Sequence, residues 1–177
     1  MLRNLASGFL LLASTLVAAH GAQIHLGNAL SFRMPDGWQD ISRKRGASPG
    51  QIFLLFAPPG EEDVKGPIVP PDGALVVVNY FGDQSPDGAI EGLIHQHRGI
   101  EYNQTICKFP ANAHLSQIHR IEWHEPESAT FVYENIEEYF SIEKHVVCVS
   151  ITYRLGNPRS PRFLRGLQDV LVSMKAH

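Results

Sequence analysis

The sequence predicts an α+β protein in which an antiparallel β-sheet is flanked by helices. Most of the chain after residue 22 falls into short segments with the two-residue periodicity or the apolar runs that are typical of strands. Only two segments show helical periodicity, one in the middle of the chain and one near its end. Because the strands follow one another in groups and do not alternate with helices, they favour an antiparallel sheet over βαβ units.

The first strands are expected between residues 23 and 81. Residues 23–34 alternate between polar and apolar, and the turn dipeptide Gly27-Asn28 divides them into two short strands. An apolar run predicts a strand at 51–57. The nearly continuous apolar run at 74–81 is typical of a strand at the centre of a sheet. The intervening residues 58–73 are rich in Pro, Gly and acidic side chains, which predicts a long irregular loop.

Two helices and a second group of strands are expected in the rest of the chain. Ser85 and Pro86 suit the start of a helix, and Gly99 suits its end. The apolar face of this helix would contain Ile90, Leu93, Ile94 and His97. Ser160-Pro161 begins a second helix of the same periodicity. Strands are expected between the helices at residues 102–109, 117–123, 129–134, 138–142 and 145–155.

The first 22 residues have the pattern of a secretory signal peptide. Arg3 precedes an uncharged, Leu-rich run, and small residues suited to cleavage follow it. The run is shorter than the roughly 20 apolar residues that a membrane-spanning helix needs. A membrane anchor or a buried helix is the alternative. We therefore expect a periplasmic or secreted protein without stable membrane insertion, in which residues 23–177 form a single domain.

Composition and charge exclude several classes of protein. With 44% hydrophobic and 19% charged residues, the 177-residue chain is unlike disordered, collagen-like or coiled-coil sequences. Its 15 basic and 18 acidic residues give a formal charge of −3. Because phosphate binding requires an excess of basic residues, nucleic acid is not an expected partner.

Cys107 and Cys148 are the two cysteines of the chain. In an oxidising compartment an even number of cysteines usually indicates disulfides, so we expect these two to pair. Such a bridge would contribute roughly 4 kcal/mol by restricting the unfolded chain. The alternative is that Cys148, which lies in an apolar strand, is an unpaired buried thiol.

A turn after the second strand has the form F-x-x-P-x-G-W, with Phe32, Pro35, Gly37 and Trp38 at its defined positions. Together with the amphipathic helix in mid-chain and the closing helix, this motif resembles the PsbP-like superfamily, which includes small exported bacterial domains of unknown function. The resemblance implies an antiparallel sheet between helices, an α/β/α sandwich, and a structural role for the four motif residues. It also implies binding or assembly, as in photosystem subunits, a Ran-GTPase binder and chaperones of type VI secretion effectors.

The sequence contains no motif for catalysis, a cofactor or a metal ion. Gly-x-Ser-x-Gly, Cys-x-x-Cys, His-Glu-x-x-His and a Gly-rich phosphate loop are all absent. His119 and His124 lie five residues apart on a predicted strand and should point to opposite faces. Glu122 should share a face with Arg120 and His124. Acidic residues that we interpret as solvated strand ends gather near one predicted hairpin: Glu134, Glu137, Glu138 and Glu143.

These observations predict an exported, non-catalytic binding or interaction module of the cell envelope, with another protein as its partner. Protection against a toxin in the same compartment, or a role in assembly, fits this prediction. The irregular, acidic loop at 58–73 is the predicted contact region. One alternative is a periplasmic hydrolase whose site combines distant His and acidic residues such as His119, His124 and Glu122. A carrier of a small apolar ligand is another.

Overall fold

The computed structural model describes residues 21–60, 69–83, 86–97, 99–126 and 131–177. Nearly all of the expected signal peptide, residues 1–22, therefore lies outside the described residues. The middle of the 58–73 loop and the expected helix cap Ser85 lie outside them as well.

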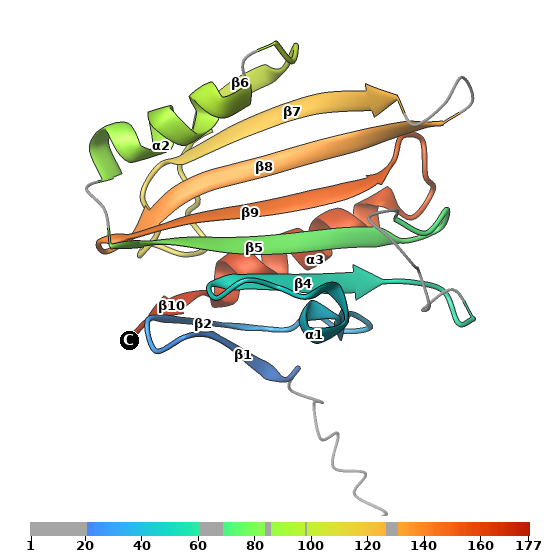
Figure 1. Cartoon of the computed structure of the whole chain (residues 1–177), viewed down its shortest axis with the longest axis horizontal. Helices are drawn as coiled ribbons and strands as arrows, with labels where there is room; N and C mark the ends of the chain where they lie inside the picture. The colour runs from blue at the N-terminus through green and yellow to red at the C-terminus, as the bar shows by residue number, and fades with distance from the viewer. Residues whose placement is uncertain (1–20, 61–68, 84–85, 98, 127–130) are drawn as a thin grey trace, which may run out of the picture.

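A seven-stranded sheet forms the centre of the molecule (Figure 1). Each strand pairs antiparallel with its neighbours. From one edge to the other, the strands are β3 (Gln39–Asp40), β4 (Gln51–Phe56), β5 (Ala74–Asp83), β9 (His145–Arg154), β8 (Val132–Ile142), β7 (Ile118–Pro126) and β6 (Asn103–Cys107).

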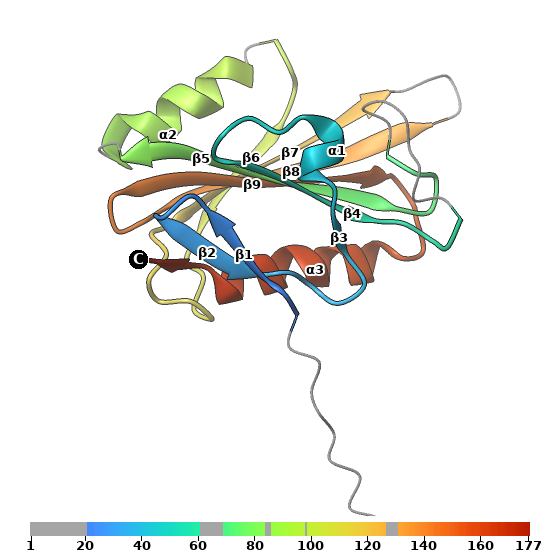
Figure 2. The ribbon, with the colours of Figure 1, turned by 60° about the horizontal axis from the view of Figure 1, so that its bottom comes forward.

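Helices cover parts of both faces of this sheet, as Figure 2 shows. One face carries α2 (Pro86–Ile94), which continues into the 3₁₀ turn η1 (His95–His97). The other face carries α3 (Ser160–Ser173) and a small sheet, which has the strand order β1 (Gln23–Leu26), β2 (Leu30–Arg33) and β10 (Lys175–Ala176). A single helical turn, α1 (Ser42–Arg45), precedes β4. This arrangement confirms the predicted α+β class with an antiparallel sheet between helices.

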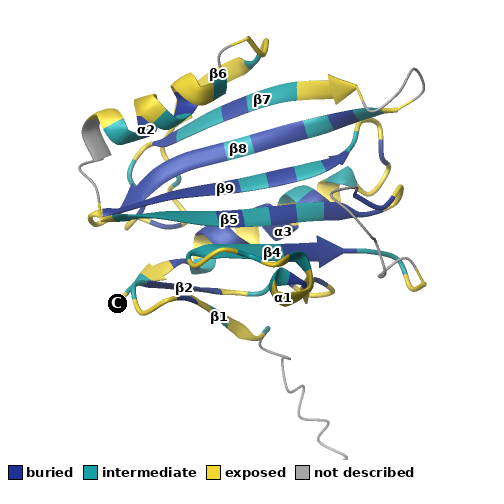
Figure 3. Ribbon diagram, in the orientation of Figure 1, coloured by how far each residue is buried: buried dark blue, intermediate teal, exposed yellow. Residues whose placement is uncertain are grey.

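The central strands are buried on both sides because their side chains alternate between two apolar clusters (Figure 3). On β9, Val147, Val149 and Ile151 pack into the cluster under α3. Val146 and Cys148 of the same strand pack into the smaller cluster under α2, together with Ile90 and Ile94. The nearly continuous apolar pattern of β9 therefore follows from its central place in the sheet.

The F-x-x-P-x-G-W turn fixes α3 against the sheet. Phe32 is fully buried, and Gly37 has a φ of +82°, a left-handed conformation that glycine adopts without strain. Trp38 lies so close to α3 that a Cβ atom at Gly166 would be 2.6 Å from its indole nitrogen. The Trp38 ring also packs at 5.8 Å from the ring of Phe56 on β4. The turn therefore joins the small sheet, the large sheet and α3.

β8 is one strand, whereas the sequence predicts two, at 129–134 and 138–142. Its polar central residues, which interrupt the apolar pattern, have partners across the sheet. Thr152 of β9 donates a hydrogen bond to Asn135 at 2.8 Å, and Arg120 of β7 binds Glu138. Because cross-strand partners satisfy these side chains, the strand continues through a polar segment that resembles a turn in sequence.

The predicted disulfide is wrong, because both cysteines are free. Cys107 is exposed on the edge strand β6, whereas Cys148 is buried on β9, three strands away. Three strand spacings amount to about 14 Å, and a disulfide requires Cα atoms within about 7 Å of each other. The side chains also lie on opposite faces. Cys107 pairs with Ile118 of the cluster under α3, and Cys148 belongs to the cluster under α2.

Candidate functional site

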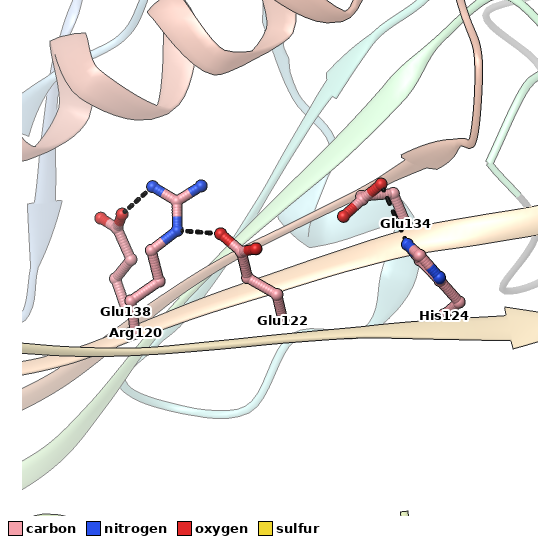
Figure 4. Close-up of polar contacts among 5 residues, drawn as sticks. All are labelled: Arg120, Glu122, His124, Glu134 and Glu138. Carbon is pink, nitrogen blue, oxygen red and sulfur yellow. Dashed lines mark hydrogen bonds and ion pairs between the residues drawn. The ribbon is translucent and has the colours of Figure 1, made fainter. Parts of the chain in front are cut away.

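A group of charged side chains lies on the α3 side of β7 and β8, beyond the part of the sheet that α3 covers. Strand alternation and register place five residues on this face, with Arg120 opposite Glu138 and His124 opposite Glu134. We call this group the β7–β8 polar face: Arg120, Glu122, His124, Glu134 and Glu138 (Figure 4). α3 packs on β9 and β2, and on this face of β7 the exposure rises from Arg120 and Glu122, which are half-buried, to His124, which is exposed.

Arg120 links two carboxylates of this face. Its Nε donates a hydrogen bond to Glu122 on the same strand, and its Nη1 lies 3.3 Å from Glu138 Oε1 on the neighbouring strand. Both bonds come from a planar guanidinium that can bind two carboxylates at once. Arg120 is therefore held in place by its own strand and by β8.

Glu138 is the most buried member of the polar face, with 5% of its surface exposed. Burial raises the pKa of its carboxyl to about 7; the charge of Arg120 lowers it and that of Glu122 raises it. Its Oε2 atom has no hydrogen-bond partner among the described residues. Glu138 therefore changes its protonation state near neutral pH, which an exposed glutamate does not do.

A pocket of about 400 Å³ opens at the other end of the polar face, where β6 begins and β7 ends. Within it, His124 Nε2 lies 3.3 Å from Glu134 Oε2. The pocket is lined by Glu101, Tyr102, Asn103, Glu122, Trp123, His124 and Glu134. Three carboxylates and one imidazole give it a negative potential, which suits cationic or hydrogen-bond-donating groups and does not suit an apolar ligand.

The residues of the expected hydrolase site are not brought together. Glu122 and His124 lie on the α3 side of β7, as their spacing predicts. His119 pairs with Tyr139, which packs under α2, so its side chain faces the opposite side of the sheet. The combination of all three residues is therefore wrong, for the geometric reason that residues an odd number apart on a strand diverge.

The acidic residues near the predicted hairpin are also separated. Glu134 and Glu138 lie on the polar face, whereas Glu137 lies on the α2 side. Glu143 follows the end of β8, in the turn to β9, with a φ of +55°. Glu138 is thus in the interior of a long strand and not at a solvated strand end. No sequence pattern indicates this position, because the interruption of the apolar pattern suggests a break between two strands.

A second polar cluster, centred on His97, lies under the end of α2. Its imidazole contacts three aromatic rings, with 5.1 Å between the ring centroids of His97 and Trp123. His97 Nε2 lies 3.3 Å from the Glu137 carboxylate, which also accepts a hydrogen bond from Tyr139. The helical spacing predicts His97 on the inner face of the mid-chain helix, but the sequence does not identify its aromatic partners. The cluster fixes η1 to the sheet.

The C-terminal end of the 58–73 loop contacts the segment before α3, while residues 61–68 are outside the described residues. Asn157 Nδ2 donates a hydrogen bond to the Pro71 carbonyl at 3.1 Å, and Arg159 Nη1 lies 3.3 Å from the Asp72 carbonyl oxygen. The C-terminal end of this loop is therefore attached to the segment that leads into α3.

The described residues contain neither a metal-binding cluster nor a membrane-spanning helix. Within these residues, no three or more His, Cys, Asp or Glu side chains are grouped so that they could hold a metal ion. In the same part of the chain, no helix has the length and apolar character to cross a membrane.

Comparison with known proteins finds likeness in structure and not in sequence. No family model and no curated protein matches the sequence. The Ran-binding protein Mog1p of Saccharomyces cerevisiae superimposes with a TM-score of 0.53 over 87% of this chain and 94% of Mog1p, at 12% identity. The fold is the Mog1/PsbP-like fold. This likeness agrees with the resemblance that the turn motif suggests, at the level of the fold.

Two further structures share this architecture. LpqN of Mycobacterium tuberculosis, described as involved in cell envelope biogenesis, has a TM-score of 0.52 at 10% identity over 88% of this chain and 89% of LpqN. A protein of Bacteroides thetaiotaomicron has a TM-score of 0.57 at 12% identity over 89% of this chain. The present chain spans about half of that protein's length (49%). At these identities the likeness concerns the fold.

Proposed function

We propose that the protein is an exported, non-catalytic binding module that contacts another protein of the cell envelope. The observation that carries this proposal is the fold, which is shared with a Ran-binding protein and with a protein of cell envelope biogenesis. The charged N-terminus, short apolar run and small residues within 1–22 support export. Protection against a toxin and assistance in assembly are the two roles that fit. A toxin gene next to this gene would favour the first role.

The polar face and its pocket are the first candidate contact region. Open, concave and lined by Glu101, Glu122 and Glu134, the pocket is suited to basic side chains of a protein partner. The loop at 58–73 is the second candidate, because it is acidic and long for a connection within a compact domain. Both regions would act through charge, so binding should weaken as the salt concentration rises.

Cross-linking and capture from cell envelopes tests this function. We expect the protein to capture a defined partner, and Glu134→Gln in the pocket to reduce the yield about fivefold, which corresponds to about 1 kcal/mol. Glu91→Gln on the exposed side of α2 is the matched control, because it removes the same charge elsewhere. Deletion of residues 61–68 tests the loop separately. Capture that neither change affects would remove both regions from the proposal, and capture of no partner would contradict the function itself.

A hydrolase remains the second candidate, and Glu138 is the observation that favours it. A carboxyl group with a pKa of about 7 is suited to donate or accept a proton at neutral pH. Screening of ester, peptide and glycan substrates, with the wild type and with Glu138→Gln, tests this function. Activity that Glu138→Gln abolishes in a folded protein would support the hydrolase over the binding module.

A further inference from the structure

The two edges of the seven-stranded sheet are protected very differently. β3 forms one edge with only two residues, and Asp40 accepts hydrogen bonds from the backbone and side chain of Ser42. β6 forms the other edge with five residues, Asn103–Cys107, all of which are exposed. Natural edge strands usually avoid pairing with other chains by being short or by carrying charges, prolines or bulges. β3 follows that rule, and β6 does not.

The composition of β6 makes it suitable for pairing on its free side. Its sequence, Asn-Gln-Thr-Ile-Cys, contains no charged residue and no proline. Its register with β7 is regular over all five residues. Ile106 is 53% exposed, an unusual position for a β-branched apolar side chain with high strand propensity. The helix α2 packs on β8 and β9, and all five residues of β6 remain exposed.

We infer that β6 pairs with β6 of a second copy of this chain, so that the two sheets become continuous across a two-fold axis. In antiparallel pairing about a two-fold axis normal to the sheet, each residue lies opposite a residue of the second copy. The two side chains of each such pair then lie on the same face of the continuous sheet. With Thr105 on the axis, Asn103 faces Cys107 of the second copy, and Gln104 faces Ile106. The free backbone groups of each edge then find partners, which is the general basis of strand addition.

The charges that flank β6 favour a second copy as the occupant. Glu101 precedes the strand and Lys108 follows it. In an antiparallel pair, the acidic end of each strand lies beside the basic end of the other. No like charges stand opposite one another in the strand itself, where they would be destabilising. A five-residue strand pair buries a small area, so we expect a dimer that dissociates on dilution. This inference does not depend on the proposed function.

Sedimentation of the purified protein at a series of concentrations tests the dimer. We expect wild type to change from monomer to dimer as its concentration rises. Thr105→Lys and Thr105→Glu each place like charges opposite one another on the axis and should weaken the dimer about tenfold. An equimolar mixture of the two variants should form the dimer again, because opposite charges then face each other. A wild type that stays monomeric, or a dimer that both variants leave intact, would overturn the inference.

A cross-linking variant tests the register without weakening the pair. Asn103→Cys places a thiol opposite Cys107 of the second copy, so mild oxidation should give a covalent dimer. Gln39→Cys, on the opposite edge strand β3, is the matched control and should give little covalent dimer. Thermal unfolding establishes that each variant is folded. Equal yields of covalent dimer from the two variants would contradict pairing through β6.

Discussion

The α3 side of the sheet has a closed part and an open part, and the same strand contributes to both. Along β7, the residues on this side change from Ile118, which is buried, through Arg120 and Glu122 to His124, which is exposed. Side chains alternate between the two faces along the whole of β7. On the α3 side they change from apolar to charged where the cover formed by α3 and the small sheet ends. The extent of the core on this face is therefore determined by its cover, α3 and the small sheet.

The two parts should differ first in their contribution to stability. Phe163 of α3 is fully buried in the closed part, with its ring centroid 5.5 Å from that of Phe56 and 5.7 Å from that of Tyr153. Phe163→Ala removes this packing and leaves a cavity, so it should lower the free energy of unfolding by about 3–5 kcal/mol. Urea denaturation measures the loss. A loss below about 1 kcal/mol would mean that α3 is not the cover that closes this part.

At the border between the two parts, Glu138 should make stability depend on pH. Because its pKa is about 7 when folded and near 4.5 when unfolded, the folded state binds the proton more tightly. The resulting stabilisation is complete below about pH 4.5 and is lost as the pH rises to about 7. The pKa difference limits it to about 3 kcal/mol.

Comparison of Glu138→Gln with the wild type isolates this contribution, because other carboxylates titrate in both proteins. The difference in unfolding free energy between the two should change across pH 4.5–7, in the direction that favours the wild type at low pH. A difference that is independent of pH would show that Glu138 has an ordinary pKa.

The contact between Trp38 and Gly166 should be sensitive to a single methyl group. A Cβ atom at Gly166 would lie 2.6–2.7 Å from three atoms of the Trp38 ring, so the ring or the helix has to move. Gly166→Ala should therefore destabilise the protein by about 1–3 kcal/mol, even though alanine favours helix formation. Gly92→Ala on α2, where no atom lies within 4 Å, is the control and should not destabilise. The thermal midpoints of both variants check this difference.

Substitution in the open part should have the smallest effect on stability. Glu134→Gln removes the contact of the Glu134 carboxylate with Nε2 of His124, whose side chain is 56% exposed. Because a polar contact with an exposed side chain contributes little, the free energy of unfolding should change by less than about 1 kcal/mol. A loss as large as that of Phe163→Ala would erase the distinction between the closed and the open part.

Local patterns in the sequence were sufficient to predict much of the fold. The Gly27-Asn28 turn separates β1 from β2, and the apolar run of β9 has its expected place at the centre of the sheet. The inner face of α2 contains Ile90 and Ile94, as their spacing predicts. In each case the residues that determine the structure are neighbours along the chain.

Features that depend on distant partners were not predicted. β8 continues through its polar middle because Arg120 and Thr152 lie beside it. The cysteines are apart because of the strand order, which their own positions in sequence do not reveal. For the pocket, the sequence placed Glu122 and His124 on one face. It did not show that the start of β6 and Glu134 complete the walls. Strand order, not periodicity, determines these features.

We propose that the protein binds its partner through the open part of the sheet. A photo-crosslinking amino acid at His124, in the pocket, tests this binding region when it is compared with the same amino acid at Glu91 on α2. After irradiation of intact cells, we predict a cross-link to one defined protein from His124 and none to that protein from Glu91. Equal cross-linking from both positions, or cross-linking from Glu91 alone, would contradict the account.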